Sequence, residues 1–399
     1  MTRTLLVLNA GSSSLKFALY GHDPRLPLCL KGSVSRLGQA PQLTIVSADR
    51  ADAGRDLGTC PMSCRDALPV VFAAIADRGL TGRIATVGHR IVHGGQGFTR
   101  PVLLDQSILE RLHHLAPMVP LHQSVNLEMV EMAANLLPKA VQIGTFDTAY
   151  HADRPRCDRL YGLPRDLSDD GILAYGFHGL SYEHVAAVLR ERDGPRAGGR
   201  TIVAHLGSGA SLCAMLAGRS VATTMGFSTL DGLVMSSRCG SLDPGIVLHL
   251  IRERQMSAEA VSDLLYRHSG LLGVSELSGD MQVLLQSSDP HAMEAVGLFV
   301  YRIGRAIGSM AAAVSGLDTL VFTAGIGENA PEIRRRIGQA AEWLGVRIDP
   351  ERNLRGDASI GCAGSRVEVL VIPADEERAV AKASLAALAA AAATDPAGG

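Results

Sequence analysis

Two stretches of the chain, about two hundred residues apart, share one pattern. Residues 5–20 read LLVLNAGSSSLKFALY, and residues 201–216 read TIVAHLGSGASLCAML. Each is an apolar run, a small polar turn and a second apolar run, which is typical of a β-hairpin. Gly207 falls in the second stretch where Gly11 falls in the first. The repetition predicts a duplicated fold whose two halves face one ligand.

The turn of the first hairpin carries groups that suit a phosphate. Gly11 lets the backbone approach a ligand closely, and Ser12, Ser13 and Ser14 add hydroxyls beside the backbone N–H groups. Lys16 adds a point charge. A tight β-turn without a ligand is the alternative for either hairpin alone, whereas the presence of two copies favours a phosphate loop.

The composition bounds the class of protein. A chain of 399 residues accommodates two domains or three, and 47% hydrophobic with 20% charged residues is typical of a globular protein. A formal net charge of -2 gives no indication of a nucleic-acid or membrane partner. The seven cysteines include no CxxC pair, which favours a reducing cytoplasm. Neither a signal peptide nor a membrane-spanning run is expected.

The string HRIVHGG, residues 89–95, ends a strand predicted over 84–92. His89 and His93 have the spacing of helical zinc ligands, but the β-branched residues between them favour a strand, so metal ligation is disfavoured. Arg90, which precedes two glycines by a few residues, fits an anion-binding arginine. A structural ion pair is the alternative role for this arginine.

Further along the first half, helices are predicted over 66–78 and 107–137, the second interrupted by prolines that present His122 on a loop. A strand that starts at residue 141 ends at Asp147. Open α/β sheets place functional groups just past the carboxyl ends of their strands. Aspartate is also a common turn former, so a catalytic and a structural interpretation of Asp147 both stand.

The second half opens with AYGFHGLSYEHV, in which glycines flank His178 closely. A helix is predicted to begin at Ser181 as its N-cap, and His178 is either a satisfied helix-start residue or a donor aimed into a cleft. Residues 223–247 are rich in Gly, Ser and Thr and predict a long functional loop. Arg238 can extend from this loop without crowding, because its neighbours are small.

The string TLVFTAGIGENAPEIRRRIG, residues 319–338, predicts a strand, a glycine turn and a helix whose capping box joins Asn329 and Glu332. The amino end of that helix suits a phosphate or a ribose. A rival interpretation uses the same residues: GIGENA satisfies the GxGxxG/A pattern, and Asp349 follows a second predicted strand, as in a nicotinamide-dinucleotide fold. The chain closes with a strand, an acidic turn at 375–377 and an alanine-rich helix.

Several strings occur together and in one order: NAGSSSLK, GHRIVHGG, FDTAYH, YGFHGLSY, HLGSGAS, RCGSLDPG, AGIGENAP and IPADEE. The set resembles the acetate kinases of the acetate and propionate kinase family, from Leu5 to about Ala381. The resemblance implies a duplicated α/β fold of the actin-like and sugar-kinase-like (ASKHA) class, with an active-site cleft between two domains. Residues 1–152 would bind the acyl substrate, residues 153–379 would bind the nucleotide and dimerise, and a helix over about 380–394 would pack back on the first domain.

The resemblance also implies an activity: reversible, ATP-dependent phosphorylation of acetate to acetyl phosphate by direct in-line transfer, with Mg²⁺ or Mn²⁺. The protein would be a cytoplasmic homodimer, and propionate or another short-chain carboxylate is the alternative acceptor. Acetate is ionised at neutral pH and needs no strong general base. What it needs is relief from charge repulsion, which two arginines, a histidine and Mg²⁺ can supply at the equatorial oxygens of the transition state. Asp147 would then orient an arginine or metal-bound water.

The resemblance assigns roles residue by residue. The catalytic group would be Asp147, His178 and Arg238, and the metal would lie near Asn9 and Glu376. The substrate would be bound by Arg90, Val92, Leu121, His122 and Phe177. The nucleotide would be bound by Lys16, His205, Leu206, Gly207, Ser208, Gly209, Asp280, Met281, Gln282, Gly325, Ile326, Gly327, Glu328 and Asn329.

Four positions depart from the family's pattern. Ser208 stands where asparagine is common, Gln282 where arginine is usual, Asp375 where an asparagine precedes the glutamates, and Thr229 where a proline commonly walls the acyl pocket. These departures bear on nucleotide affinity and on acyl-chain preference. Three classes of function stay open: a carboxylate kinase, a nicotinamide-dependent dehydrogenase, and a non-catalytic actin-like scaffold that binds ATP. The intact set of candidate catalytic residues favours the first.

Overall fold

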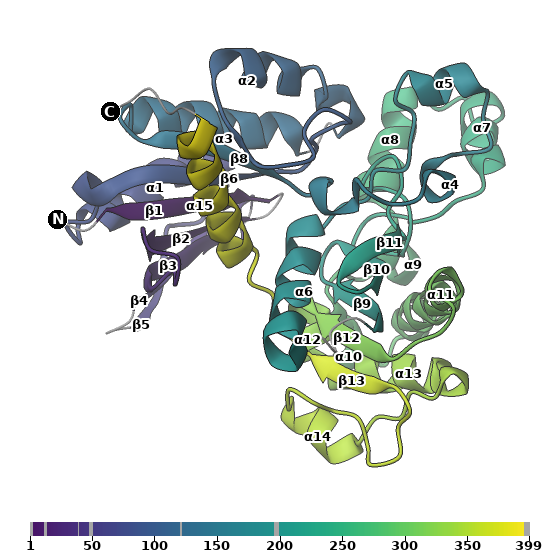
Figure 1. The fold of residues 1–399 in the computed structure, drawn as a ribbon. Helices are drawn as coiled ribbons and strands as arrows, with labels where there is room; N and C mark the ends of the chain where they lie inside the picture. Colours follow the sequence, from purple (N-terminus) through teal and green to yellow (C-terminus); the bar gives the residue numbers. More distant parts are fainter. Residues whose placement is uncertain are drawn as a thin grey trace. The chain divides into compact units, whose positions relative to one another are not determined.

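The computed structural model describes residues 3–11, 14–38, 40–47, 51–119, 122–194 and 199–394. The chain divides into two compact units, which we call unit 1 (residues 1–149 and 375–399) and unit 2 (residues 150–374). Each unit contains one β-sheet flanked by helices (Figure 1). The acyl-binding, nucleotide-binding and dimerisation roles expected of the two predicted domains stay predictions. Ser12, Ser13 and Leu121 lie outside the described residues.

Unit 1 is built on a sheet with the strand order β5-β4-β3-β2-β1-β6-β8-β7. Its strands are β1 (Thr4–Ala10), β2 (Ser14–Gly21), β3 (Leu28–Ser35), β4 (Gln42–Ser47), β5 (Ala51–Asp56), β6 (Ile84–Ile91), β7 (Val102–Leu103) and β8 (Val141–Phe146). Its helices are α1 (Cys64–Ala76), α2 (Gln106–His113), α3 (Gln123–Leu136) and α15 (Glu376–Thr394), with 3₁₀ turns at Thr81–Arg83 and Ala116–Met118. β1, β6 and β8 run parallel, so their carboxyl ends meet at one edge of the sheet.

The strand β1 is buried along its whole length, and its alternate side chains pack on the two faces of the sheet. Leu6 and Leu8 belong to an apolar core that also contains residues of α1 and α3. Successive side chains of a strand point to opposite faces. Asn9 therefore projects from the other face, where its side chain hydrogen-bonds with Glu376 at the start of α15. The alternation thus leaves one polar side chain of β1 beside the acidic end of α15.

Unit 2 contains a second sheet, with the strand order β11-β10-β9-β12-β13. Its strands are β9 (Arg200–Leu206), β10 (Ala210–Leu216), β11 (Arg219–Thr223), β12 (Thr319–Thr323) and β13 (Glu368–Val371). Its helices are α4 (Arg156–Arg159), α5 (Arg165–Asp169), α6 (Gly179–Asp193), α7 (Pro244–Arg252), α8 (Ala258–Arg267), α9 (Gly270–Ser275), α10 (Met281–Gln286), α11 (Pro290–Ala313), α12 (Ala324–Asn329), α13 (Pro331–Ala340) and α14 (Pro350–Arg355).

The two sheets repeat one topology. The order β3-β2-β1-β6-β8 in unit 1 corresponds to β11-β10-β9-β12-β13 in unit 2, and in both a hairpin with a third antiparallel strand precedes two parallel strands. The predicted duplication is therefore confirmed. The long loop is confirmed too, since residues 224–243 contain neither helix nor strand. Within the described parts of the chain, no helix is long and apolar enough to cross a membrane.

The contact between β6 and α15 generates a prediction about unit 1. A methyl group on Gly88 would lie 2.5 Å from Ser384 Oγ and 2.9 Å from Val380 Cγ1, both in α15. We expect Gly88→Ala to destabilise unit 1 by about 1–3 kcal/mol, because overpacking forces backbone shifts. Urea denaturation followed by circular dichroism measures this loss. Gly82→Ala is the control, since its methyl group meets no atom within 4 Å; equal midpoints for the two variants would contradict the prediction.

Candidate active site

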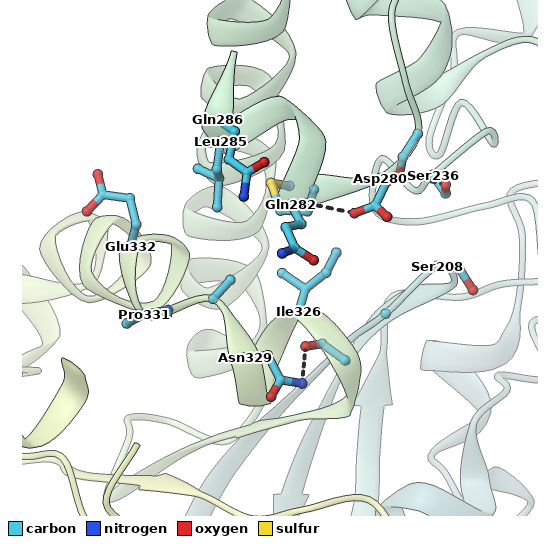
Figure 2. Close-up of a pocket in the computed structure, with 15 residues that line it drawn as sticks. Ser208, Ser236, Asp280, Gln282, Leu285, Gln286, Ile326, Asn329, Pro331 and Glu332 are labelled. Atoms are coloured by element: carbon cyan, nitrogen blue, oxygen red, sulfur yellow. Dashed lines mark hydrogen bonds between the residues drawn. The ribbon is translucent and has the colours of Figure 1, made fainter. Parts of the chain in front are cut away.

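A cavity of about 740 Å³ lies in unit 2 (Figure 2). Its walls come from the β9–β10 turn, the start of α10 and the segment from α12 to the start of α13. The lining residues are Gly207, Ser208, Ser236, Gly279, Asp280, Met281, Gln282, Leu285, Gln286, Gly325, Ile326, Asn329, Ala330, Pro331 and Glu332. Its size lies in the range of sites for cofactors and other small molecules.

One wall of the cavity is α12, a short helix where a glycine turn was predicted. The helix follows β12 directly, and Ala324 at the corner has a left-handed backbone with φ 66°. Non-glycine residues adopt this conformation at a cost, and such residues cluster at functional sites. The corner directs Gly325 and Ile326 to the cavity wall, so the prediction of the element was wrong while its place in a binding site is supported.

The predicted capping box at the start of α13 was also wrong. The N-cap is Ala330, and Pro331 occupies the first helical position. Asn329 Nδ2 instead donates to the carbonyl of Gly325 at 2.9 Å (Figure 2). The carboxylate of Glu332 accepts hydrogen bonds from two arginines of the next turn at 2.7 Å. Proline has no N–H to satisfy, so this helix begins without a side-chain cap.

The structure does not support the nicotinamide-dinucleotide interpretation, because Asp349, the acid expected to bind the ribose, has another role. Asp349 is the N-cap of α14, and its Oδ1 accepts hydrogen bonds from the backbone N–H groups of Glu351 and Arg352 at 3.0 Å. The predicted second strand before it is wrong, since Val346 and Ile348 form only isolated β-bridges. The strand that pairs in parallel with β12 is β13, further along the chain.

The opposite wall of the cavity is the start of α10. Asp280 is its N-cap, with Oδ1 accepting from the N–H of Gln282 at 2.8 Å. Figure 2 shows the side-chain amide of Gln282 extending toward Ile326. An amide that offers both a donor and an acceptor next to an apolar side chain suits the edge and face of a heterocyclic base.

Three side chains that carry or accept protons converge near the β9–β10 turn. A methyl group on Gly209 would lie 2.9 Å from Arg238 Nη2 and 3.1 Å from His178 Nε2. The rings of His178 and His205 stack with centroids 4.1 Å apart. Arg238 Nη1 donates to the carbonyl of Thr229 at 2.7 Å. Because Gly207 and Ser208 of the same turn line the cavity, these donors gather beside one end of it.

The helix predicted to begin at Ser181 begins two residues earlier, at Gly179. Its N-cap is His178, which has a left-handed backbone with φ 58°. This conformation turns the chain into the helix early and leaves Ser181 inside it. The hydroxyl of Ser181 is then hydrogen-bonded to His205 Nδ1 at 2.8 Å, and His178 Nδ1 lies 2.8 Å from Ser211 Oγ. Both imidazole rings are thereby oriented by serine hydroxyls.

The other predicted residues gather in unit 1, around Arg90 at the end of β6. Arg90 Nη2 donates to Asp147 Oδ2 at 2.6 Å, Nε donates to Oδ1 at 3.0 Å, and Nη1 donates to Asn9 Oδ1 at 3.1 Å. The side chain of Asp147 is 1% exposed and that of Arg90 is 14% exposed. Burial lowers the pKa of Arg90, but the carboxylates of Asp147 and Glu376 outweigh it and raise the pKa. Arg90 therefore stays charged.

The acidic turn that begins α15 completes this cluster. Asn9 Nδ2 donates to Glu376 Oε2 and to Glu377 Oε1, both at 2.9 Å. Lys31 Nζ on β3 lies 3.1 Å from Asp375 Oδ1 and 3.3 Å from Glu377 Oε2. Burial lowers the pKa of Lys31, and its two carboxylate neighbours raise it by more. Lys31 thus holds the two outer acids of the turn as a cation.

The cluster in unit 1 carries an excess of negative charge. In the ion pairs of the described residues, two cations, Arg90 and Lys31, face the four carboxylates of Asp147, Asp375, Glu376 and Glu377, an excess of two negative charges for this set. Among the described residues, no group of three or more His, Cys, Asp or Glu side chains could hold a metal ion. Oxygen donors with a negative net charge suit a hard divalent cation. Such a cation would take its remaining ligands from water and phosphate.

The two histidines with zinc-like spacing are structural. His89 Nε2 is hydrogen-bonded to Gln142 Oε1 at 2.8 Å, and His93 Nδ1 accepts from the N–H of Gly95 at 2.8 Å. Burial lowers the pKa of each histidine to about 4. Both are therefore neutral near pH 7 and hold the end of β6 in place.

The remaining predicted residues are placed as follows. Val92 is buried, and its N–H donates to Asn126 Oδ1. His122 is the N-cap of α3. Phe177 is buried and its carbonyl is hydrogen-bonded to His151. Lys16 is exposed on β2, paired across the hairpin with Asn9. Leu206 is the buried last residue of β9.

The model of the Acetokinase family matches residues 4–382. The chain belongs to the acetokinase family.

Several acetokinase-family proteins are similar to this chain over nearly its whole length. A protein of Rhodopseudomonas palustris described as acetate kinase is 50% identical over 391 residues, which cover 96% of this chain and 98% of the relative. A propionate kinase structure from Francisella tularensis has a TM-score of 0.87 at 31% identity and covers 96% of this chain and 99% of its own. The Porphyromonas gingivalis acetate kinase structure has a TM-score of 0.84 at 32% identity, covering 97% and 100%.

Some residues of the site were not predicted. Arg334 is buried, donates to the carbonyls of Gly327 and Glu328, and so holds the end of α12. Lys31 has no local signal in the sequence, because its carboxylate partners lie more than three hundred positions away. Ser211 gave a usable signal, since it is a polar residue within an apolar strand of the second hairpin.

The convergence on Gly209 generates a prediction within this acetokinase-family site. We expect Gly209→Ala to displace the side chains of His178 and Arg238 and to weaken ATP binding by roughly tenfold, about 1.4 kcal/mol. Isothermal titration calorimetry measures the affinity, and circular dichroism checks the fold. Gly297→Ala on α11 is the control, because its methyl group meets no atom within 4 Å. An unchanged affinity in Gly209→Ala would contradict the prediction.

Proposed function

We propose that the protein is an acetate kinase that transfers the γ-phosphoryl group of ATP reversibly to acetate. The observation that carries the proposal is the convergence of His178 and Arg238 on Gly209, beside one end of a nucleotide-sized cavity. Membership of the acetokinase family and the acetate kinase name of a half-identical relative support it. A non-catalytic scaffold would not require such a group of donors.

The cavity in unit 2 is proposed as the ATP site. Ile326 and Gln282 lie near each other in the cavity (Figure 2), and would offer the adenine ring an apolar surface and a polar edge. The backbone of the Gly207–Gly209 turn would receive the phosphates, because glycine allows the main chain to approach them closely. The γ-phosphoryl group would then meet Arg238 and His178.

Arg90 in unit 1 is proposed to bind the acetate carboxylate. Acetate is already ionised at neutral pH, so the reaction needs no general base for its oxygen. Asp147 matches that requirement, because it is buried and engaged by two donors of Arg90. Its role would be to fix the guanidinium plane, which improves the geometry of a two-point contact with a carboxylate.

The chemical difficulty is the approach of one anion to another. Arg238 and the Nε2 side of His178 would donate to the equatorial oxygens of the transferring group as its bond to ADP breaks and its bond to the acetate oxygen forms. Each positioned donor of this kind supplies on the order of 3 kcal/mol of barrier reduction. The proposal requires that acetate held by Arg90 reach the phosphoryl group in line with the leaving oxygen.

Mg²⁺ or Mn²⁺ is proposed as the metal, near Asn9 and Glu376. The excess negative charge and the oxygen donors of the unit 1 cluster fit a hard cation. When bound, the metal supplies further charge neutralisation on the phosphates. Lys31 and Arg90 would keep the neighbouring carboxylates ordered around it.

Propionate or another short carboxylate is the second candidate acceptor. The Francisella tularensis neighbour is described as a propionate kinase, although relatives at higher identity are described as acetate kinases. Thr229 bears on this choice: its buried hydroxyl has no hydrogen-bond partner among the described residues, and its carbonyl accepts a hydrogen bond from Arg238. Because Thr229 differs from the proline common in the family and contacts Arg238, we expect this position to affect the acyl preference.

We also propose a homodimer and a cytoplasmic location. The helix α7 exposes Ile246, Leu248 and Ile251 at 44%, 50% and 40%, and none of its residues is buried. An apolar helix needs a cover, and a second copy of this chain would supply one. All seven cysteines are free of disulfides, which supports a reducing compartment.

Arg90 and Arg238 generate the test of the proposed activity. We expect Arg90→Ala and Arg238→Ala each to lower acyl phosphate formation from ATP and acetate by at least about a hundredfold, since each removes a donor to an anion. Trapping with hydroxylamine measures the product, and formate, propionate and butyrate in parallel rank the acceptors. Arg302→Ala, an exposed arginine on α11, should retain wild-type activity. Failure of the wild-type protein to phosphorylate any of these acids would refute the proposal.

The exposed face of α7 generates the test of assembly. We expect light scattering to give twice the chain mass for the wild type, and Leu248→Glu to shift it to the monomer mass, because a carboxylate cannot be buried in an apolar interface without cost. Leu354→Glu is the matched control, since Leu354 is 76% exposed on α14. A wild-type monomer, or an unchanged dimer in Leu248→Glu, would exclude this face as the interface.

A further inference from the structure

A chain of hydroxyl groups runs from the core of unit 2 to His178. Tyr182 OH and Ser211 Oγ are 2.5 Å apart, and Ser211 Oγ is 2.8 Å from His178 Nδ1. Tyr182 and Ser211 are both fully buried. The other ring nitrogen, Nε2, is the one near Gly209. The buried chain therefore ends on the side of the imidazole away from the phosphoryl site proposed above.

The register of the second hairpin places Ser211 for this contact. Ser211 pairs with His205 across β9 and β10, and residues paired directly across antiparallel strands share one face of the sheet. That face also carries Val203 and Cys213, which pack with Tyr182 of α6. The helix and the strand thus present the phenol and the serine hydroxyl to each other.

The protons of this chain have one arrangement that satisfies every donor. Burial raises the pKa of Tyr182 well above its ordinary value, so the phenol keeps its proton. The hydrogen-bond partner that the structure gives the phenol is Ser211, so Tyr182 donates to Ser211 and Ser211 donates its own proton to His178 Nδ1. In the reverse order, the buried phenolic proton would have no acceptor among the described residues, which costs about 1–3 kcal/mol.

A nitrogen that accepts a hydrogen bond carries no proton, so the proton of a neutral His178 lies on Nε2. A doubly protonated ring would have to donate from Nδ1 to Ser211, which would leave the proton of Ser211 with no acceptor in this chain of hydroxyl groups. The stacked ring of His205 adds to this preference, since two positive rings with centroids 4.1 Å apart would repel each other.

We propose that Tyr182 and Ser211 are positioning residues that hold His178 in the neutral form with its proton on Nε2, as a hydrogen-bond donor to the phosphoryl group. The inference rests on the proposed function for the identity of the acceptor. The tautomer itself is a property of the protein without substrate. His178 would then donate to a phosphoryl oxygen without moving a proton during the transfer.

The direct test is the protonation state of His178 by ¹⁵N-correlated NMR in the ligand-free protein, with its signals assigned by their loss in His178→Asn. We expect the proton on Nε2 in the wild type. In Tyr182→Phe, the phenol no longer competes with Nδ1–H for the lone pairs of Ser211 Oγ, so the Nδ1-protonated form should gain population. Tyr150→Phe is the matched control: it removes the hydroxyl of a half-buried tyrosine that packs against the same cluster and donates to the carbonyl of Gly218.

Kinetics test the consequence for catalysis. We expect Tyr182→Phe to lower kcat by roughly tenfold with KM for ATP and acetate changed less than about twofold, because a donor to the transition state is misplaced. Ser211→Ala should act in the same direction, and Ser211→Thr, which keeps a hydroxyl, should restore the wild-type NMR signature. A wild-type His178 protonated on Nδ1, or a Tyr182→Phe spectrum identical to that of the wild type, would overturn the inference.

The two readouts separate this inference from the proposed function. If the wild type makes no acyl phosphate but the NMR signature responds to Tyr182→Phe as expected, the proposed function is refuted and the positioning role of Tyr182 and Ser211 is supported. If the protein phosphorylates acetate but His178 does not carry its proton on Nε2, the positioning role is refuted and the proposed function is supported.

Discussion

The guanidinium group of Arg90 organises the carboxylates of unit 1. It bonds with Asp147 through two nitrogens and with Asn9 through a third, at the ends of three parallel strands. Asp147 is almost completely buried, and removing one partner of a buried ion pair costs about 3–5 kcal/mol. Asn9 in turn positions Glu376 and Glu377 through its amide nitrogen. Arg90, the proposed acetate-binding residue, thus also orders Asp147 and Asn9, and through Asn9 the carboxylate of Glu376 proposed to lie near the metal.

Unit 2 repeats the sheet topology of unit 1, but different side chains occupy the matching positions of its strands. Asn9 and His205 are each the next-to-last residue of the first strand of their hairpins. Asn9 pairs with Lys16, whereas His205 pairs with Ser211, and the second hairpin has the tighter register by one residue. A shift of one residue changes which side chains of a strand share a face. It brings Ser211 beneath α6, next to His178, so a small difference in one turn accounts for the hydroxyl chain.

The sequence predicted the framework because the framework depends on local patterns. Apolar runs around small polar turns gave both hairpins, and the repeat of that pattern gave the duplication. Local patterns failed where the backbone bends unusually. The helix α6 begins before the serine that the pattern predicts as its cap, because the left-handed backbone of His178 makes the turn into the helix. The segment predicted as a glycine turn is the helix α12, because the left-handed backbone of Ala324 turns the chain directly from β12 into it. Pairs such as Lys31 with Asp375 depend on tertiary packing and have no local signature.

His178 and Ala324 both have a left-handed backbone, which glycine adopts more readily. Each residue costs of order 1–2 kcal/mol that glycine would avoid, so we expect its side chain to make a compensating contact. At His178 this contact is made by the imidazole ring near Gly209. At Ala324 the methyl group lies 3.6 Å from where a side chain of Gly207 would begin, so it fills space between α12 and the β9–β10 turn. The strained backbone at the two corners thus places the side chains of His178 and Ala324 beside the Gly207–Gly209 turn, part of which lines the nucleotide-sized cavity.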